Sequence, residues 1–250
     1  GLKPNYDKLK EIAKKGVKVM IVDSLYSGED RKTASEKVAR SLLEDVMLTT
    51  TNDRAGIVVT TFSSHIARLK SIVEFGKKLG REVVFVGRSL NKYTNAAKNA
   101  NICPYTRDVK ILTFKGHIER ILRNIDKDRT KYLVVSTGHQ GEPGSALDKM
   151  SRGNLPFRLK PEDHVIFSSS VIPTPSNIKN REELDRRLKK IGVRIFSNVH
   201  VSGHAGREDL RDFVNLVHPE HVIPAHGEHE KCKPMVELCK ELGYKPEKNV

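Results

Sequence analysis

The feature that most constrains the fold is a repeated alternation of short apolar runs with longer amphipathic stretches. The apolar runs are rich in Val and Ile and recur at Val17–Asp23, Ile57–Phe62, Glu82–Val86, Tyr132–Ser136, His164–Ser168, Val193–Phe196 and His221–Pro224. Because neighbouring positions in each run are both apolar, each run predicts a strand that is buried on both faces. Strands of this kind are typical of parallel sheets covered by helices.

The amphipathic stretches between these runs predict helices. Their apolar residues are spaced i, i+3, i+4, which places them on one face of a helix and leaves the opposite face in water. The stretches are Ser35–Val46, Ile66–Leu79, His117–Ile125, Glu182–Ile191, Glu208–Val217 and Lys233–Leu242. Alternating strands and helices predict an α/β fold with a largely parallel sheet.

Composition limits the location and the partners of the protein. The three cysteines are an odd number without a C-x-x-C pair, which indicates neither a disulfide framework nor a zinc knuckle and favours a reducing, cytoplasmic location. No apolar run reaches the ~20 residues of a membrane span, so no membrane partner is expected. The chain has 45 Lys and Arg against 31 Asp and Glu, a net charge of +14. This excess favours nucleic acid as the partner.

Polar residues follow the predicted strands, at the edge where α/β sheets bind their ligands. Asp23 ends the first strand, where a carboxylate binds a metal or a ribose hydroxyl, or caps a turn. His226 follows the last strand and is either a metal ligand or a structural histidine. His200 and His204 have the i, i+4 spacing of helical zinc sites, but the Val-Ser-Gly between them indicates a loop and no Glu follows His200. That helical zinc motif is therefore rejected.

Two loops have the composition of anion-binding segments. Residues 136–145 contain Gly138, Gly141 and Gly144, which let backbone N–H groups approach an anion or simply form a tight turn. Residues 61–65 precede a predicted helix and either contact phosphate or cap that helix.

Seven short strings, taken in order, resemble the β-CASP branch of the metallo-β-lactamase superfamily, and most closely its ribonuclease J group. They are Val-Asp-Ser at 22–24, Thr-Phe-Ser-Ser-His at 61–65, Val-Gly-Arg-Ser at 86–89, Thr-Gly-His-Gln-Gly-Glu-Pro at 137–143, Ser-Ser-Ser-Val-Ile-Pro at 168–173, Val-Ser-Gly-His-Ala at 201–205 and Pro-Ala-His-Gly-Glu at 224–228. The resemblance spans almost the whole chain. It implies a β-CASP domain, which is a Rossmann-like parallel sheet flanked by helices, with partial metallo-β-lactamase elements of the αββα kind.

The resemblance implies a role for each matching side chain. Asp23 corresponds to the carboxylate that bridges two zinc ions, and His226 corresponds to the zinc ligand that marks RNA-directed members. His204 corresponds to the histidine that protonates the leaving oxygen, and Glu36 to the acidic residue that orients this histidine. His204, Glu36 and Asp23 together form the catalytic group that the resemblance implies.

The resemblance also implies partners and domain limits. The expected phosphate-binding residues are Ser63, Ser64, Ser136, Thr137, Gly138, Gly141, Ser168, Ser202 and Gly203. The expected partner is single-stranded RNA with a 5′-monophosphate, and the sequence leaves open whether the chain forms a homodimer. Residues 38–198 are expected to form the β-CASP domain, and residues 1–37 with 199–250 part of the metallo-β-lactamase domain.

One departure from the family limits what this chain is expected to do alone. The main metal-binding motif of the family, H-x-H-x-D-H, is absent from the sequence, which begins with Gly1 and is expected to be an excised segment. We therefore expect an incomplete two-zinc site and an inactive isolated chain. The complete enzyme is expected to be a zinc-dependent ribonuclease of RNA processing and decay, acting as a 5′-to-3′ exonuclease and also as an endonuclease. The alternatives are a 3′-end-processing endonuclease of the same branch and a non-catalytic RNA-binding module.

Overall fold

The computed structural model describes residues 4–50, 54–105, 107–112 and 115–250, which form two compact units. One unit contains residues 37–201, and the other contains residues up to 36 together with 202–250. No helix in the described ranges is long and apolar enough to cross a membrane.

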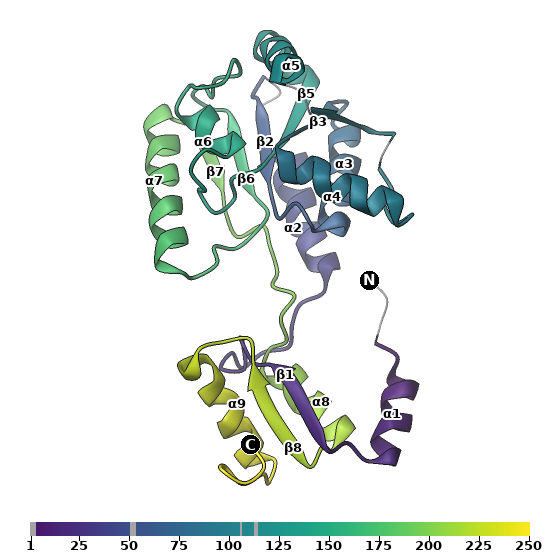
Figure 1. Cartoon of the computed structure of the whole chain (residues 1–250). Helices are drawn as coiled ribbons and strands as arrows, with labels where there is room; N and C mark the ends of the chain where they lie inside the picture. Colours follow the sequence, from purple (N-terminus) through teal and green to yellow (C-terminus); the bar gives the residue numbers. More distant parts are fainter. Residues whose placement is uncertain (1–3, 51–53, 106, 113–114) are drawn as a thin grey trace. The chain divides into compact units, whose positions relative to one another are not determined.

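The larger unit is built on a six-stranded sheet whose strands are all parallel. Its order is β4-β3-β5-β2-β6-β7 (Figure 1). The strands are β2 (Ile57–Thr60), β3 (Glu82–Val86), β4 (Val109–Leu112), β5 (Tyr132–Ser136), β6 (His164–Phe167) and β7 (Arg194–Phe196). Because all six run in one direction, the loops that follow them leave the same edge of the sheet.

Helices cover both faces of this sheet, as the apolar runs predict. Alternate strand residues divide the core into two layers, with Val59 and Val135 in one and Val58 and Val134 in the other. The first layer packs against α2 (Glu36–Thr49) and α3 (Ile66–Lys78). The second packs against α5 (Lys115–Lys127), α6 (Ala146–Ser151) and α7 (Pro175–Ile191). Helix α4 (Arg88–Asn99) and the short 3₁₀ helix η1 (Arg129–Lys131) complete this unit.

The smaller unit contains a two-stranded parallel sheet, β1 (Val19–Asp23) with β8 (His221–Ala225). In the core of this unit, alternate residues of the sheet, such as Met20 and Val22, pack against α8 (Arg207–Val217) and α9 (His229–Glu241). Helix α1 (Tyr6–Lys15) precedes β1 and has no buried residue.

The prediction that every strand is buried on both faces is wrong for β1 and β8. Val19, Ile21 and Ile223 are 45%, 70% and 47% exposed. They lie on the face opposite the core, because α8 and α9 pack against the residues that point the other way. The described residues therefore cover one face of this sheet and leave an apolar face in solvent.

Among the α-helices and strands, three are absent from the sequence-based expectation: α1, β4 and α4. Strand β4 has only four residues and an exposed Lys110 at its centre, so it lacks a continuous apolar run. Helix α4 buries Leu90, Thr94 and Ala97, of which only Leu90 is strongly apolar. A helix that buries a single strongly apolar residue lacks the i, i+3, i+4 apolar series by which the other helices were predicted.

The buried carboxylate of Asp163 links the segments that precede β2, β5 and β6 in the larger sheet. Asp163 accepts hydrogen bonds from the backbone N–H of Gly56 and of Lys160, both at 2.8 Å, and forms an ion pair with Arg129. The Asp163 side chain is 2% exposed and that of Arg129 is 11% exposed. Removing one partner of such a pair leaves an uncompensated charge and unsatisfied N–H groups in the interior.

We expect Asp163→Ala to lower the free energy of unfolding by about 3–5 kcal/mol. The matched control is Glu119→Ala, which removes a carboxylate from an exposed i, i+4 pair on α5 and should cost roughly 0.5 kcal/mol or less. Urea unfolding of both variants measures the difference. Equal losses would show that the Asp163 network does not stabilise the sheet.

Candidate metal centre

Parallel pairing of β1 with β8 brings Asp23 and His226 together. The strands are in register from Val19 opposite His221 to Asp23 opposite Ala225, and the next backbone N–H, of Ser24, donates to the Ala225 carbonyl at 2.9 Å. Asp23 is the last residue of β1, and His226 directly follows β8 with φ of 64°. Two residues about 200 positions apart in sequence thus meet at one sheet edge, as the reading of the strand ends predicts.

His204 is brought to the same place by a loop tied to the segment after β1. The His204 carbonyl accepts a hydrogen bond from the Thr33 hydroxyl at 2.8 Å, and the same hydroxyl accepts one from the Gly206 N–H at 3.0 Å. Gly206 also forms a parallel β-bridge with Tyr26. These contacts fix the backbone from the His204 carbonyl to Gly206, and His204 is in a loop and not a helix, as its flanking residues predict.

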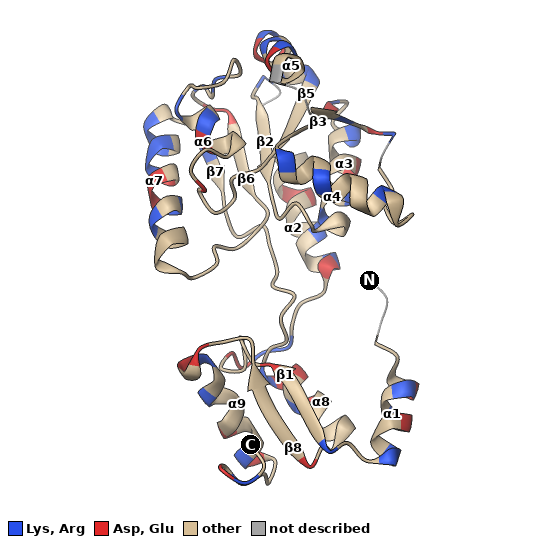
Figure 2. Cartoon of the chain, in the orientation of Figure 1, with Lys and Arg blue, Asp and Glu red and all other residues tan. Residues whose placement is uncertain are grey.

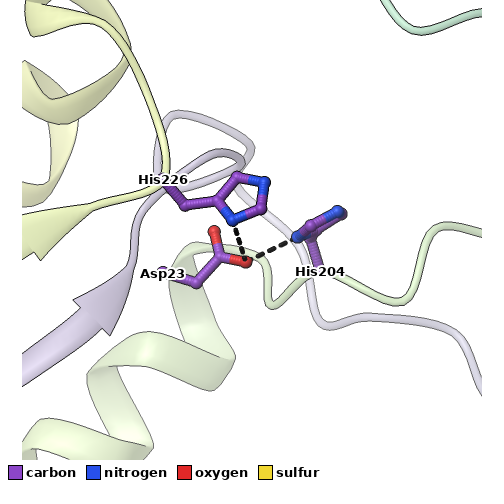
Figure 3. A group of neighbouring side chains, drawn as sticks. All are labelled: Asp23, His204 and His226. Atoms are coloured by element: carbon purple, nitrogen blue, oxygen red, sulfur yellow. Dashed lines mark hydrogen bonds and ion pairs between the residues drawn. The ribbon is translucent and has the colours of Figure 1, made fainter.

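The three side chains form a compact cluster (Figure 3). His204 Nδ1 lies 2.6 Å from Asp23 Oδ2, and His226 Nδ1 lies 4.0 Å from the same oxygen. One ligand atom from each residue lies within 4.8 Å of the other two. The side chains of Asp23, His204 and His226 are 37%, 36% and 61% exposed, so solvent and small ions reach the cluster.

Asp23 is held in its charged form. Partial burial opposes ionisation, but the Leu25 N–H, which donates to Asp23 Oδ1 at 3.0 Å, and the neighbouring His204 and His226 outweigh it. Together they lower the pKa of the Asp23 carboxyl below its ordinary value. A carboxylate must be deprotonated to bind a metal ion, so this environment favours binding.

The donor set fits a zinc ion, because carboxylate oxygen and imidazole nitrogen are ordinary zinc ligands and catalytic zinc sites use three protein ligands. Asp23, His204 and His226 are the only group of three or more potential metal ligands within the described ranges. A two-zinc centre requires more donors than these three residues offer. The geometry therefore fits part of a metal centre.

Four residues were expected to act in catalysis or in metal binding, and the structure unites three of them: Asp23, His204 and His226. The division of roles among them, with His226 as ligand and His204 as acid, stays a prediction. Glu36 is the first residue of α2, and its pairing with His204 also stays a prediction. Sequence reasoning missed Thr33 and Tyr26, which hold the His204 loop, because such long-range contacts leave no local pattern in the sequence.

The expected phosphate-binding residues are divided between the two units. Ser202 and Gly203 adjoin His204 in the smaller unit, and the Ser202 hydroxyl accepts a hydrogen bond from the His204 N–H at 3.2 Å. The remaining seven residues follow β2, β5 and β6 or end β5, at one edge of the six-stranded sheet: Ser63, Ser64, Ser136, Thr137, Gly138, Gly141 and Ser168.

Several of these residues have structural contacts of their own. The Ser168 hydroxyl donates to the Val199 carbonyl and accepts from the buried Arg68 guanidinium, at 2.8 and 2.7 Å. Gly138 and Gly141 have φ of 118° and 76°, and a Cβ on Gly141 would lie 2.4 Å from the Asn180 carbonyl oxygen. Both glycines are thus required by the turn itself. The Ser63 hydroxyl lies 2.9 Å from that of Ser89, so the loop after β2 contacts the first turn of α4.

Two family models match the chain and define its class. Residues 54–182 match "Ribonuclease J, beta-CASP domain", and residues 189–248 match "Zn-dependent metallo-hydrolase RNA specificity domain". The first lies within the six-stranded unit, and the second contains His204 and His226. The class is therefore a β-CASP domain joined to an element of a metallo-hydrolase.

Curated relatives agree with this class. The chain is 43% identical over 244 residues to ribonuclease J of Pyrococcus abyssi, a match that covers 98% of the chain and 54% of the relative. It is 41% identical over 246 residues to ribonuclease J of Methanocaldococcus jannaschii, covering 98% of the chain and 55% of the relative. A third relative, ribonuclease J of Thermus thermophilus, is 30% identical over 249 residues, with 97% of the chain and 41% of the relative covered. The chain belongs to the ribonuclease J family, and it spans about half the length of the first two relatives.

Proposed function

We propose that this chain is part of a zinc-dependent ribonuclease that hydrolyses RNA phosphodiester bonds. The observation that carries this proposal is the cluster of Asp23, His204 and His226 at the paired ends of β1 and β8, in a member of the ribonuclease J family. The printed name of the relatives, Ribonuclease J, supports RNA as the substrate. The basic composition, with a net charge of +14, supports the same substrate class.

Asp23 and His226 would hold the metal, which supplies an activated water and stabilises negative charge on oxygen when bound. His204 would protonate the leaving oxygen. Its Nδ1 faces Asp23 Oδ2 at 2.6 Å, so the carboxylate orients the ring and fixes which of its nitrogens faces the carboxylate. The other ring nitrogen, Nε2, then remains available to donate the proton. Glu36 would assist as a second orienting carboxylate.

Two compact units support the proposed division into domains. We assign residues 38–198 to the β-CASP domain and residues 1–37 with 199–250 to part of a metallo-β-lactamase domain, close to the unit boundaries at residues 36 and 202. We place the enzyme in the cytoplasm because its three cysteines are free thiols. A homodimer stays a prediction.

We assign the cleavage mode as 5′-to-3′ exonuclease with endonuclease activity. The string Thr-Gly-His-Gln-Gly-Glu at 137–142, which resembles the ribonuclease J version, favours this mode over a 3′-end-processing endonuclease. A non-catalytic RNA-binding module is favoured by one observation, the absence of H-x-H-x-D-H from the chain. Zinc analysis combined with hydrolysis of labelled RNA distinguishes the enzyme from the module.

We expect the active enzyme to degrade RNA with a 5′-monophosphate about tenfold or more faster than the same RNA with a 5′-hydroxyl. The proposed phosphate residues offer hydroxyl groups and backbone N–H groups, and a hydrogen bond to a charged group contributes about 1.5–3 kcal/mol. Because such contacts do not read bases, the preference should hold for RNAs of different sequence. Time courses of degradation of labelled RNAs measure this preference. Equal rates on the 5′-monophosphate RNA and the 5′-hydroxyl RNA would favour the endonuclease alternative.

A further inference from the structure

Helix α4 differs from the other long helices of its unit because all its charges are positive. It contains Arg88, Lys92 and Lys98 and no acidic residue, and the chain has no Asp or Glu from residue 87 to residue 107 (Figure 2). The other helices of ten or more residues in this unit mix both signs. A charge pattern of one sign attracts a partner of the opposite sign.

These three cations are exposed and lack acidic partners in the described part of the chain. On α3, by contrast, Lys77 pairs with Asp108 at 2.5 Å and Lys78 with Glu44 at 2.7 Å. Arg88, Lys92 and Lys98 form no ion pair with any described residue. Their charge is therefore available to an external anion.

The exposed face of α4 also carries groups that suit a single-stranded nucleic acid. Its cations Arg88 and Lys92 share this face with Asn95 and Asn99, at i, i+4, i+7 and i+11 spacing, while the buried residues of α4 lie on the opposite side. Tyr93 is 44% exposed and lies at one margin of this face, about 100° around the helix from Lys92, while the exposed Lys98 lies at the other margin. Amide groups and cations bind phosphate and sugar, and an exposed aromatic ring stacks on a base.

Helix α4 begins at the sheet edge that holds the proposed phosphate loops. It directly follows β3, and the hydroxyl of Ser89 in its first turn lies 2.9 Å from that of Ser63 in the loop after β2. From this point its 12 residues extend about 18 Å. A strand held at the edge can therefore continue along α4 without leaving the unit.

We propose that the exposed face of α4 is a second RNA-contact surface, which binds the backbone of single-stranded RNA and stacks a base on Tyr93 at its margin. This proposal rests on the proposed function, because it takes RNA as the substrate. It adds a surface on an element that none of the expected site residues occupies. The charge complementarity between α4 and a polyanion is what selects this partner.

The test is RNA binding by the 250-residue chain with the charges of α4 removed. The triple variant Arg88→Gln, Lys92→Gln and Lys98→Gln should bind a labelled single strand of about 16 nucleotides roughly 10- to 50-fold more weakly near 0.15 M salt, and the salt slope should fall by about 2, because each lost phosphate contact accounts for about 0.7. The matched control removes one Arg and two Lys from α7, through Lys179→Gln, Arg186→Gln and Lys190→Gln. These three are equally exposed, so the control changes the net charge identically.

Fluorescence anisotropy measures binding, and circular dichroism confirms that each variant is folded. The α7 control should lose less than about threefold in affinity, and Tyr93→Ala should lose about fivefold or more, the effect of losing a stacked base.

Equal losses in the α4 and α7 variants, or none in either, would overturn the proposal while RNA binding itself still supports the proposed function. An absence of RNA binding by the unmodified chain would contradict both. A change in oligomeric state of the α4 variant without a change in RNA affinity would overturn the proposal and assign α4 to contact with a second copy.

Discussion

Replacing His204 by Ala is expected to slow RNA cleavage by the active enzyme roughly 10²–10⁴-fold, the usual contribution of a general acid. The ring lies at the centre of the cluster, 2.6 Å from Asp23 Oδ2, and its centroid is 5.0 Å from that of His226. Without this imidazole, the remaining cluster residues, Asp23 and His226, are those assigned to the metal, and no assigned proton donor is left. Single-turnover cleavage of labelled RNA measures the rate of the chemical step.

RNA affinity should be nearly unchanged in the same variant, because the proposed phosphate contacts come from other residues. The control is His117→Ala, which removes an exposed histidine from α5 and should leave the cleavage rate within about twofold. The companion variant Glu36→Gln should lose less than His204→Ala, since Glu36 is proposed to act through His204. A normal cleavage rate in His204→Ala would exclude the acid role, and a loss of RNA affinity equal to the loss of rate would make His204 a binding residue.

The strands of the larger sheet could be predicted because burial on both faces leaves a direct signature in the sequence. Val58 and Val59, for example, are both fully buried, one in each helix layer. The same signature misleads at β1, where Ile21 is 70% exposed. An apolar residue indicates a preference for burial, but the sequence does not show whether an element covers that face.

The candidate site could be predicted where it depends on local order and not where it depends on distant contacts. Asp23 and His226 end or follow strands, and parallel strands bring such ends together. The position of His204 depends on the hydroxyl of Thr33, which is 171 residues away in sequence and reaches the His204 carbonyl through tertiary packing. The resemblance to a family implied that His204 belongs to this site, whereas neither hydrophobic periodicity nor residue spacing predicts it.

The 250-residue chain by itself is expected to retain less than one zinc ion and to hydrolyse no RNA. Zinc sites with high affinity use three or four protein ligands in fixed geometry, and paired zinc ions require more. The described residues provide one group of three donors, of which only Asp23 and His226 are assigned as ligands, and His226 is 61% exposed. The sequence contains no H-x-H-x-D-H motif to supply further ligands. We therefore expect weak binding of a single ion at most.

Metal analysis of the desalted chain tests this expectation, with Asp23→Asn as the variant and Asp7→Asn, an exposed carboxylate of α1, as the control. Any zinc retained by the chain should be lost in Asp23→Asn and kept in Asp7→Asn, because Asp23 Oδ2 is the atom that both histidines face. The chain should still bind RNA through its basic surface. If it contacts six phosphates of a single strand, affinity should fall about 300-fold between 50 and 200 mM salt as counterions are released. Two zinc ions per chain, or metal-dependent cleavage of RNA by the chain, would contradict this account, because the ligands of a complete centre would then have to lie within these 250 residues.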